Sequence, residues 1–285
     1  MYKLTSEKCC YVILCAFGHQ NFYILMFEPH IVETDLKSKM EELFRYRFFY
    51  EILDENEDAA LFEQLYALQT AIYHLDAHLE AHWKTDQKNL DFHWDNIKTN
   101  LIKFGVQDSE LPSYLNHIAK YQQHEMDIRK GLLPTRLEME YFYFYKSCDV
   151  KLLRRLIYET RLKGSKSFGS LSDWRYFDLV TEVNDDVADI FEDLSFINGN
   201  RFILTMGLMG KDEAKRVFIE FLQDIQQTIK KKLSLTKNPF LHQLHKLTLQ
   251  HIHETILLIH KNTEAMDQQT LAGAKLFQYL KMEKA

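Results

Sequence analysis

The sequence has few of the residues that interrupt helices. Its 285 residues include only four Pro and nine Gly, against twenty Phe and fifteen Tyr. Because Pro and Gly end helices and make turns, their scarcity predicts long, uninterrupted helices. With 46% hydrophobic residues, a chain of this length can bury a substantial core as one domain. We therefore expect an all-α protein.

Cysteine, basic charge and long apolar runs are also scarce. Cys9, Cys10, Cys15 and Cys148 offer neither zinc-ligand pairs nor a disulfide framework, which favours a reducing cytoplasm. A net charge of −6 leaves no basic footprint for nucleic acid. No run of about eighteen apolar residues occurs, so we expect no stable membrane insertion.

The first thirty residues have a different character from the rest. Lys3 and Lys8 precede an apolar run over residues 9–17, which has the length of a signal-peptide core but no small-x-small cleavage site. We interpret residues 1–30 as an N-terminal arm of uncertain order. An export signal and a translation start near Met26 are the alternatives. Residues 31–285 are expected to form one all-helical domain.

Apolar residues recur at helical spacing through that domain, with no strand-like alternation. Ser172 is expected to cap a helix that contains the acidic segment discussed next. The break at 147–149 between two predicted helices is a place where a site could lie. The other predicted helices are 34–50, 54–84, 87–104, 113–130, 135–145, 150–163, 201–209, 212–233, 239–261 and 263–282.

Residues 178–193 are unusually acidic. Like charges four residues apart in a helix repel by about 0.2–0.5 kcal/mol per pair, so such a helix gains nothing unless cations neutralise it. Apolar residues between the acids indicate a partly buried helix. Carboxylate and amide oxygens are ligands that Mg²⁺ prefers. The eight side chains are Asp178, Glu182, Asn184, Asp185, Asp186, Asp189, Glu192 and Asp193.

Part of this segment resembles a known metal motif. Asn184-Asp185-x-x-Ala188-x-x-x-Glu192 is similar to the Asn-Asp-x-x-Ser-x-x-x-Glu motif of class I terpene synthases, with Ala188 in place of Ser. The resemblance implies the all-helical isoprenoid synthase fold. It also implies Mg²⁺-dependent ionisation of an allylic prenyl diphosphate, followed by cyclisation or elimination.

A second resemblance overlaps the first. Asp189-Ile-Phe-Glu192-Asp193, followed by Gly199 and Arg201-Phe202, is similar to the Asp-x-x-Glu-Asp and Gly-Arg motif of squalene and phytoene synthases. Extra residues before Gly199, and Asn200 after it, depart from that pattern. Head-to-head condensation of two prenyl diphosphates is therefore the alternative, and a terpene synthase is the first choice. Both families share one fold and one ionisation step.

The resemblance also implies a first metal motif about a hundred residues earlier. Asp76 precedes Asp185 by 109 residues, and Asp76-x-x-x-Glu80 resembles the Asp-x-x-x-Asp variant of that motif, although the usual paired aspartates are absent. The magnesium ligands expected from the resemblance are Asp76, Glu80, Asn184, Asp185, Asp189, Glu192 and Asp193.

The diphosphate is expected to need basic and polar partners as well, because Arg donates bidentate hydrogen bonds to phosphate. Terpene synthases place a sensing Arg before the second motif, and Arg136 lies 48 residues before Asn184. We assign Arg136, Asn184 and Asp185 as catalytic, and Arg136, Arg201 and Tyr73 as substrate-binding. The expected partners are a prenyl diphosphate and, as an option, a second copy in a homodimer.

Two readings from other classes stay open. Histidines four residues apart share a helix with Asp76 and Glu80, as in carboxylate-histidine di-metal proteins. That class needs Glu-x-x-His pairs on two helices, and these stretches contain none. The second alternative is a non-catalytic helical bundle that uses its acidic helix as a docking face. In the di-metal hypothesis, the candidate ligands are His74, His78 and His82 together with His251, His253, Glu254 and His260.

Overall fold

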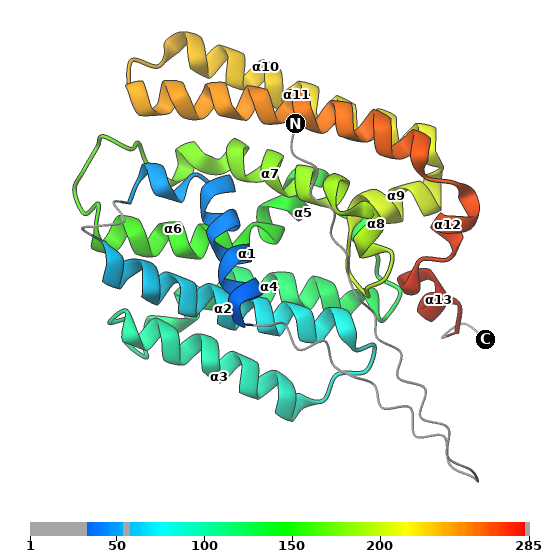
Figure 1. Cartoon of the computed structure of the whole chain (residues 1–285), viewed down its shortest axis with the longest axis horizontal. Helices are drawn as coiled ribbons and strands as arrows, with labels where there is room; N and C mark the ends of the chain where they lie inside the picture. The colour runs from blue at the N-terminus through cyan, green and yellow to red at the C-terminus, as the bar shows by residue number, and fades with distance from the viewer. Residues whose placement is uncertain (1–32, 54–57, 283–285) are drawn as a thin grey trace.

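The computed structural model describes residues 33–53 and 58–282, and these form helices joined by short loops (Figure 1). No strand occurs in these two ranges, which confirms the all-α prediction. The arm expected over residues 1–30 lies outside the described residues. The α-helices are α1 (Glu33–Tyr46), α2 (Ala59–Ala81), α3 (Gln87–Lys103), α4 (Leu111–Ile128), α5 (Met139–Lys146), α6 (Cys148–Thr160), α7 (Arg175–Ala188), α8 (Ile190–Asp193), α9 (Arg201–Met209), α10 (Lys211–Leu235), α11 (Pro239–Ala265), α12 (Gln268–Ala272) and α13 (Lys275–Met282), and short 3₁₀ turns are η1 (Phe49–Glu51), η2 (Pro134–Arg136) and η3 (Leu171–Trp174).

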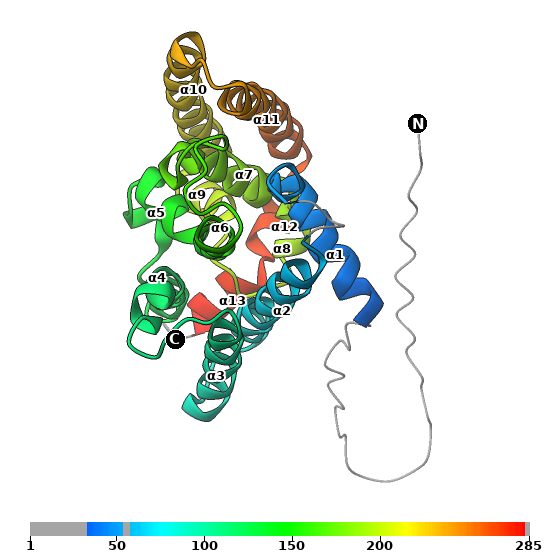
Figure 2. The ribbon, with the colours of Figure 1, turned by 90° about the vertical axis from the view of Figure 1, so that its left-hand side faces the viewer.

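Helix α6 lies at the centre of the bundle, with α2, α4, α5 and α7 around it (Figure 2). One apolar core gathers side chains of α1, α2, α3 and α6. A second gathers side chains of α5, α7, α9, α10 and α11. Helix α7 contributes to both, since Phe177 packs in the first core and Val180 in the second. Its polar residues are thereby held at the junction of the two cores.

Helix α1 is shorter than predicted, ending at Tyr46 rather than near residue 50. Phe48 follows in the left-handed region, with φ of 65°. A non-glycine residue there costs roughly 1–2 kcal/mol. The turn places Phe49 fully inside the first core and directs the buried Arg47 toward α7, which offsets that cost.

The acidic segment is not one continuous helix, as predicted, but two. Helix α7 ends at Ala188, Asp189 lies between the helices, and α8 begins at Ile190. The prediction that Ser172 caps the acidic helix is wrong. Ser170 and Asp173 instead form a reciprocal capping box on η3, which leads into α7.

The C-terminal region is also divided more finely than predicted. Helix α11 continues to Ala265, and Asp267 then caps α12 by accepting a hydrogen bond from the Thr270 amide. The helix predicted over 263–282 is therefore three elements, because the new cap starts a separate helix. Across the described ranges, none of the helices has the length and apolar character needed to cross a membrane.

Candidate functional site: carboxylates between α2 and α7

Helix α7 carries one line of buried carboxylates that have cationic partners. Asp178, Glu182 and Asp186 recur every four residues, and each is at most 3% exposed. Arg154 Nη1 donates to both Asp178 oxygens at 2.6 and 2.7 Å. Arg47 Nη2 lies 2.8 Å from Glu182 Oε1. Charged groups this deeply buried are tolerated when they are paired and hydrogen-bonded, so this line is structural.

Asp186 has the most complete set of donors in that line. Lys146 Nζ contacts Asp186 Oδ1. Tyr143 donates its hydroxyl to Oδ2 at 2.7 Å, and the Arg201 amide donates to the same oxygen at 3.0 Å. These bonds tie α5 and the start of α9 to α7.

A second line, Asp185, Asp189 and Asp193, follows on an adjacent side of α7 and α8. The Asp185 side chain is 46% exposed, and its carboxylate lies 3.6 Å from Lys146 Nζ. Asp189 is exposed. Asp193 accepts a hydrogen bond from Asn200 Nδ2 at 2.7 Å. The only ion pair of this line in the described part of the chain is the long contact of Asp185 with Lys146.

Helix α2 brings Asp76 and Glu80 to this second line. The amide of Ile197, just beyond α8, donates to the Glu80 carbonyl at 2.9 Å. Burial raises the pKa of Asp76 to about 6, against the charge of Lys146, while the charges of Asp149 and Asp185 add to the rise. The two acidic motifs, far apart in sequence, are therefore neighbours in space.

The pKa of Glu80 is raised well above its usual value, first by burial and then by the charges of Asp76 and Asp193. Burial likewise raises the pKa of Asp193 to about 7. Glu125 of α4 stands beside them. Glu125 is 2% exposed, and neither of its carboxylate oxygens has a hydrogen-bond partner that meets the usual distance and angle limits. The Tyr121 hydroxyl is nevertheless close enough to lower the pKa of Glu125.

Burial and the charge of Asp76 raise the pKa of Glu125 to about 7. We use the name acidic cluster for the group formed by Asp76, Glu80, Glu125, Asp149, Asp185, Asp189 and Asp193. Lys146 lies among them, since its charge lowers the pKa of Asp76, Glu80, Glu125, Asp189 and Asp193. The pKa of Lys146 is in turn raised by Asp186 and Asp185 against its burial, so it stays protonated.

The donor set of the acidic cluster suits a hard divalent cation, because all the donors are carboxylate oxygens. Five of these carboxylates, Asp76, Glu80, Glu125, Asp189 and Asp193, have pKa values raised first by burial and then, for most of them, by neighbouring carboxylates. Within the described residues, however, no three Asp, Glu, His or Cys side chains are placed to hold a metal ion by themselves.

Two residues of the terpene-synthase pattern lie outside this cluster. Asn184 accepts a hydrogen bond from the Tyr46 hydroxyl at 2.7 Å and donates to Thr255 Oγ1 at 2.8 Å. Its side chain thus links α1, α7 and α11. Glu192 is exposed on α8. The structure consequently brings Asp185 to α2 and leaves the first and last residues of that pattern elsewhere.

The residues assigned to the substrate are also dispersed. Arg136 is exposed and pairs with Asp127 at 3.3 Å. Arg201 is buried, donates to the Leu137 carbonyl and joins α9 to η2. Tyr73 of α2 lies beneath Lys39, whose Nζ is 5.9 Å from the ring centre.

The histidines of α2 contact one another and α3. The ring of His78 lies 4.6 Å from that of His82 and 5.0 Å from that of His93. His82 Nδ1 is hydrogen-bonded to the His78 carbonyl. On α11, His251 contacts Tyr46 instead, at 5.1 Å between ring centres. The two groups of histidines that the di-metal hypothesis would bring together therefore have different neighbours in the structure.

Sequence reasoning did not find Lys146, Glu125 and Arg47. Lys146 directly precedes the predicted helix break at 147–149 and Asp149 is its last residue, so the break was the available signal for them. Nothing in the sequence near Glu125 or Arg47 marks either residue, because their importance comes from contacts across the bundle. Asp149, which accepts from Gln69 Nε2 at 2.7 Å, connects α6 to α2.

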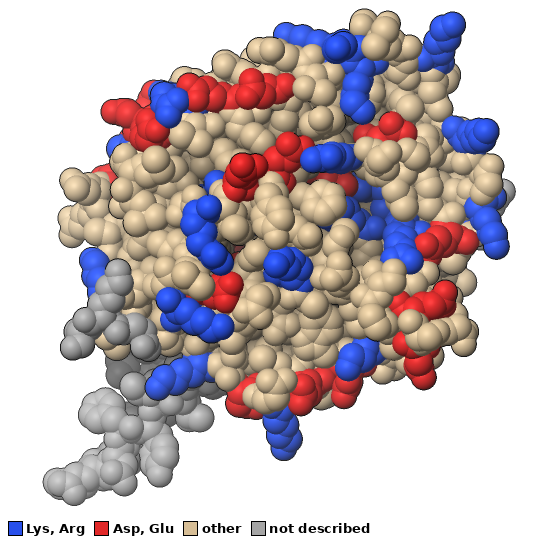
Figure 3. All heavy atoms as spheres, turned by 180° about the vertical axis from the view of Figure 1, so that it is seen from behind, with Lys and Arg blue, Asp and Glu red and all other residues tan. Residues whose placement is uncertain are grey.

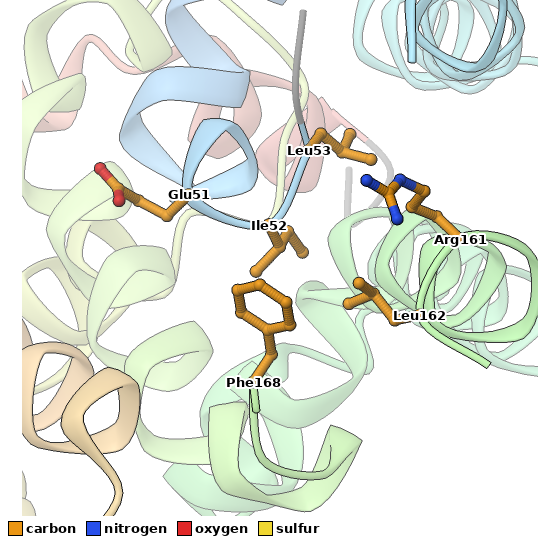
Figure 4. A pocket seen from close by; sticks show the side chains of 6 residues that line it. All are labelled: Glu51, Ile52, Leu53, Arg161, Leu162 and Phe168. Carbon is orange, nitrogen blue, oxygen red and sulfur yellow. The ribbon is translucent and has the colours of Figure 1, made fainter. Parts of the chain in front are cut away.

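Two pockets lie outside the acidic cluster. One, of about 210 Å³, is at the end of α6, where Ile52, Leu53, Leu162 and Phe168 come together while Glu51 points away (Figure 4). The other, of about 280 Å³, lies between α4 and α6. Over the face opposite to that of Figure 1, positive and negative side chains are interspersed (Figure 3).

Comparison of the chain with protein-family models, with curated proteins and with solved structures found no match.

Proposed function

We propose that this protein is a Mg²⁺-dependent enzyme of the class I isoprenoid synthase type, which ionises an allylic prenyl diphosphate. One observation carries the proposal: Asp76 and Glu80 of α2 lie beside the incompletely paired line of Asp185, Asp189 and Asp193. Carboxylates crowded in this way are stabilised by cations, and a diphosphate supplies the oxygen ligands that the cluster itself lacks.

Asp76 and Glu80 of α2 and the line of Asp185, Asp189 and Asp193 would share the magnesium ions. When bound, Mg²⁺ supplies Lewis-acid stabilisation of the charge on the departing diphosphate. Lys146 is a fixed positive charge among the ligands and is able to donate to a phosphate oxygen once the metals compete for Asp185. The donors are held by the helix framework before the substrate arrives, which lowers the reorganisation needed during ionisation.

Protonation is linked to this binding. Metal ligands must be deprotonated, whereas burial raises the pKa of Asp76 to about 6 and of Asp193 to about 7. Cation binding therefore releases protons, and its affinity rises with pH between about 6 and 8.

A specific observation favours head-to-head condensation as the second candidate. Asp189 and Asp193 form the Asp-x-x-x-Asp part of the squalene and phytoene synthase motif and share a line with Asp185. Asn184, which belongs to the terpene-synthase pattern alone, is hydrogen-bonded to Tyr46 and Thr255 instead. Ionisation is common to both candidates, and the products distinguish them.

The first test is binding. Purified protein is titrated with Mg²⁺ and inorganic diphosphate, separately and together, by calorimetry and thermal melting. We expect joint binding in the wild type and in Asp95→Asn, a matched control whose side chain is exposed on α3, and loss in Asp185→Asn and Asp193→Asn. Equal binding by all four proteins, or by none, would reject the proposal in favour of a non-catalytic docking surface.

The second test is turnover. C10 to C20 prenyl diphosphates are incubated with the protein and Mg²⁺, and products are analysed by gas chromatography and mass spectrometry. Hydrocarbons or alcohols of the substrate's chain length indicate cyclisation or elimination. Products of twice that length indicate condensation. Joint binding without any diphosphate release would contradict the enzymatic part of the proposal.

A further inference from the structure

A second pocket lies on the side of α6 that faces α4 and η3, and it shares no residue with the acidic cluster. Its volume is about 280 Å³. The lining residues are Ser113, Tyr114 and His117 of α4, Phe144 of α5, Cys148, Lys151, Leu152, Arg154 and Arg155 of α6, and Leu171 and Ser172 of η3. Three of them are Lys or Arg, and none of this lining set is Asp or Glu, although the whole chain has a net charge of −6.

Lys151 and Arg155 are one turn apart on α6 and each covers an aromatic ring. Lys151 Nζ is 3.3 Å from the centre of the Phe144 ring, and the Arg155 guanidinium is 3.7 Å from the centre of the Tyr114 ring. Cation–π contacts hold the two charges against apolar walls. The pocket thus combines a cationic edge with an aromatic body.

The three basic side chains differ in how far they are already neutralised. Arg154 is buried, and its Nη1 donates to both oxygens of Asp178. Arg155 Nε pairs with the partly exposed Glu159 at 2.8 Å. Within the described residues Lys151 forms no ion pair, and its ammonium donates a hydrogen bond to the Phe144 carbonyl. Lys151 is therefore the charge for which an anionic partner would bring the largest gain.

Burial lowers the pKa of Lys151 to about 8, so much of its ammonium charge is retained at neutral pH and lost in mild alkali. Around it, burial and the nearby cations lower the pKa of His117, which leaves this histidine neutral, and burial raises that of the Cys148 thiol. The charged or titratable groups that act on Lys151 are Cys148 and Asp149 of α6 and Asp178 and Glu182 of α7, and Lys151 and Arg155 in turn both act on His117 of α4.

We propose that this pocket binds a small organic anion, a carboxylate or phosphate monoester that carries an aromatic or compact apolar group. The anionic head lies between Lys151 and Arg155, where the Ser113 and Ser172 hydroxyls supply further donors. The apolar body packs against Phe144, whose ring is already one wall of the pocket. This site does not depend on the function proposed for the acidic cluster.

The test uses ¹⁹F NMR with 4-fluorophenyl phosphate and 4-fluorobenzoate as probes, and with uncharged 4-fluorobenzyl alcohol as the control ligand. All samples contain EDTA, so that metal-dependent binding at the acidic cluster is excluded. We expect saturable line broadening for at least one anion below about 10 mM, and affinity for the alcohol at least about tenfold weaker. If one anion binds and the other does not, the result identifies the head group.

Lys151→Met and Arg155→Gln should each weaken anion binding about tenfold, because each removes a charge-assisted contact. Arg175→Gln is the matched control, since Arg175 is an exposed arginine paired with Glu140 at 2.6 Å and lies outside the pocket. Melting curves show which variants fold, and either of the two pocket variants is sufficient for the test.

Wild-type affinity should also fall several-fold as the pH rises from 7 to about 9.5, because Lys151 loses its proton. Lys151→Met should lack that dependence. The absence of saturable binding, equal affinity for the alcohol, or binding unchanged in both pocket variants would each overturn the proposal.

Discussion

The two carboxylate lines of α7 use the same residue types on the same helix, yet they have different surroundings. Asp178, Glu182 and Asp186 are buried against Arg154, Arg47 and Lys146. The second line, Asp185, Asp189 and Asp193, lies on the adjacent side of α7 and α8. It is nearer to solvent and lies beside Asp76 and Glu80 of α2. The first line holds α7 to its neighbours, and the second is the candidate site. Position relative to the basic side chains separates a structural carboxylate from one whose charge is only partly neutralised.

Breaking the fully paired line should have the largest effect. Arg154→Met leaves Asp178 buried without the guanidinium nitrogen that donates to both of its oxygens, and we expect it to lower the free energy of unfolding by about 3–5 kcal/mol. Urea denaturation measures this loss. The double variant Arg154→Met, Asp178→Leu should recover most of it, since no uncompensated charge remains. A loss in Arg154→Met below about 1 kcal/mol would show that the pair is not structural.

Neutralising a carboxylate of the second line, or of its neighbours on α2, should stabilise the protein instead of destabilising it. Asp76→Asn removes a carboxylate whose pKa is raised to about 6, and at pH 8 we expect the metal-free protein to gain about 1 kcal/mol. Urea denaturation in EDTA measures the gain, with Asp95→Asn on the exposed face of α3 as the control. Destabilisation by Asp76→Asn would mean that Asp76 has a structural partner, as Asp178 does.

The raised pKa values of the buried carboxylates should also make the stability of the metal-free protein depend on pH. Glu125 and Asp193 have pKa values raised to about 7, so the folded protein binds protons that the unfolded chain has released. Stability from these groups is complete below the ordinary carboxyl pKa and is lost as the pH rises through 7. From pH 6.5 to 8.5 we expect the melting temperature of the metal-free protein to fall by about 2–4 °C.

The variant Glu125→Gln should reduce this slope, since it removes one of the groups that titrate. Mg²⁺ with diphosphate should also reduce it, because bound cations replace the protons. A melting temperature that rises over this range in the metal-free protein would contradict the raised pKa values.

The smallest effect is expected at Arg136, which the sequence singled out as the diphosphate sensor. Its exposed pair with Asp127 implies a change in stability of about 0.5 kcal/mol or less for Arg136→Gln. Its surface position also implies unchanged affinity for Mg²⁺ and diphosphate, whereas Lys146→Met should weaken that affinity. Calorimetric titration of the two variants compares them directly. A tenfold loss in Arg136→Gln would restore its assignment to the site.

Most helices could be predicted from the sequence, because apolar spacing and local capping residues act over a few positions. The boundaries that differed depend on less regular features. The left-handed turn at Phe48 ends α1 early, and the break at Asp189 occurs without Pro or Gly. In the candidate site, Asp76, Glu80, Asp185, Asp189 and Asp193 were named in advance and lie together. Lys146 was not, although the predicted helix break next to it was a signal, and Glu125 and Arg47 were not, since nothing near them in the sequence marks them.

The sequence by itself determined the all-α class, the positions of the main helices and the two acidic segments, because these follow from composition and helical period. Only the tertiary structure decided which acidic side chains are neutralised. Arg47, Lys146 and Arg154 come from three separate elements, and their contacts with α7 join residues up to 135 positions apart, as in the pair Arg47–Glu182. Burial and neighbouring charge control carboxylate behaviour, and both are properties of the assembled bundle.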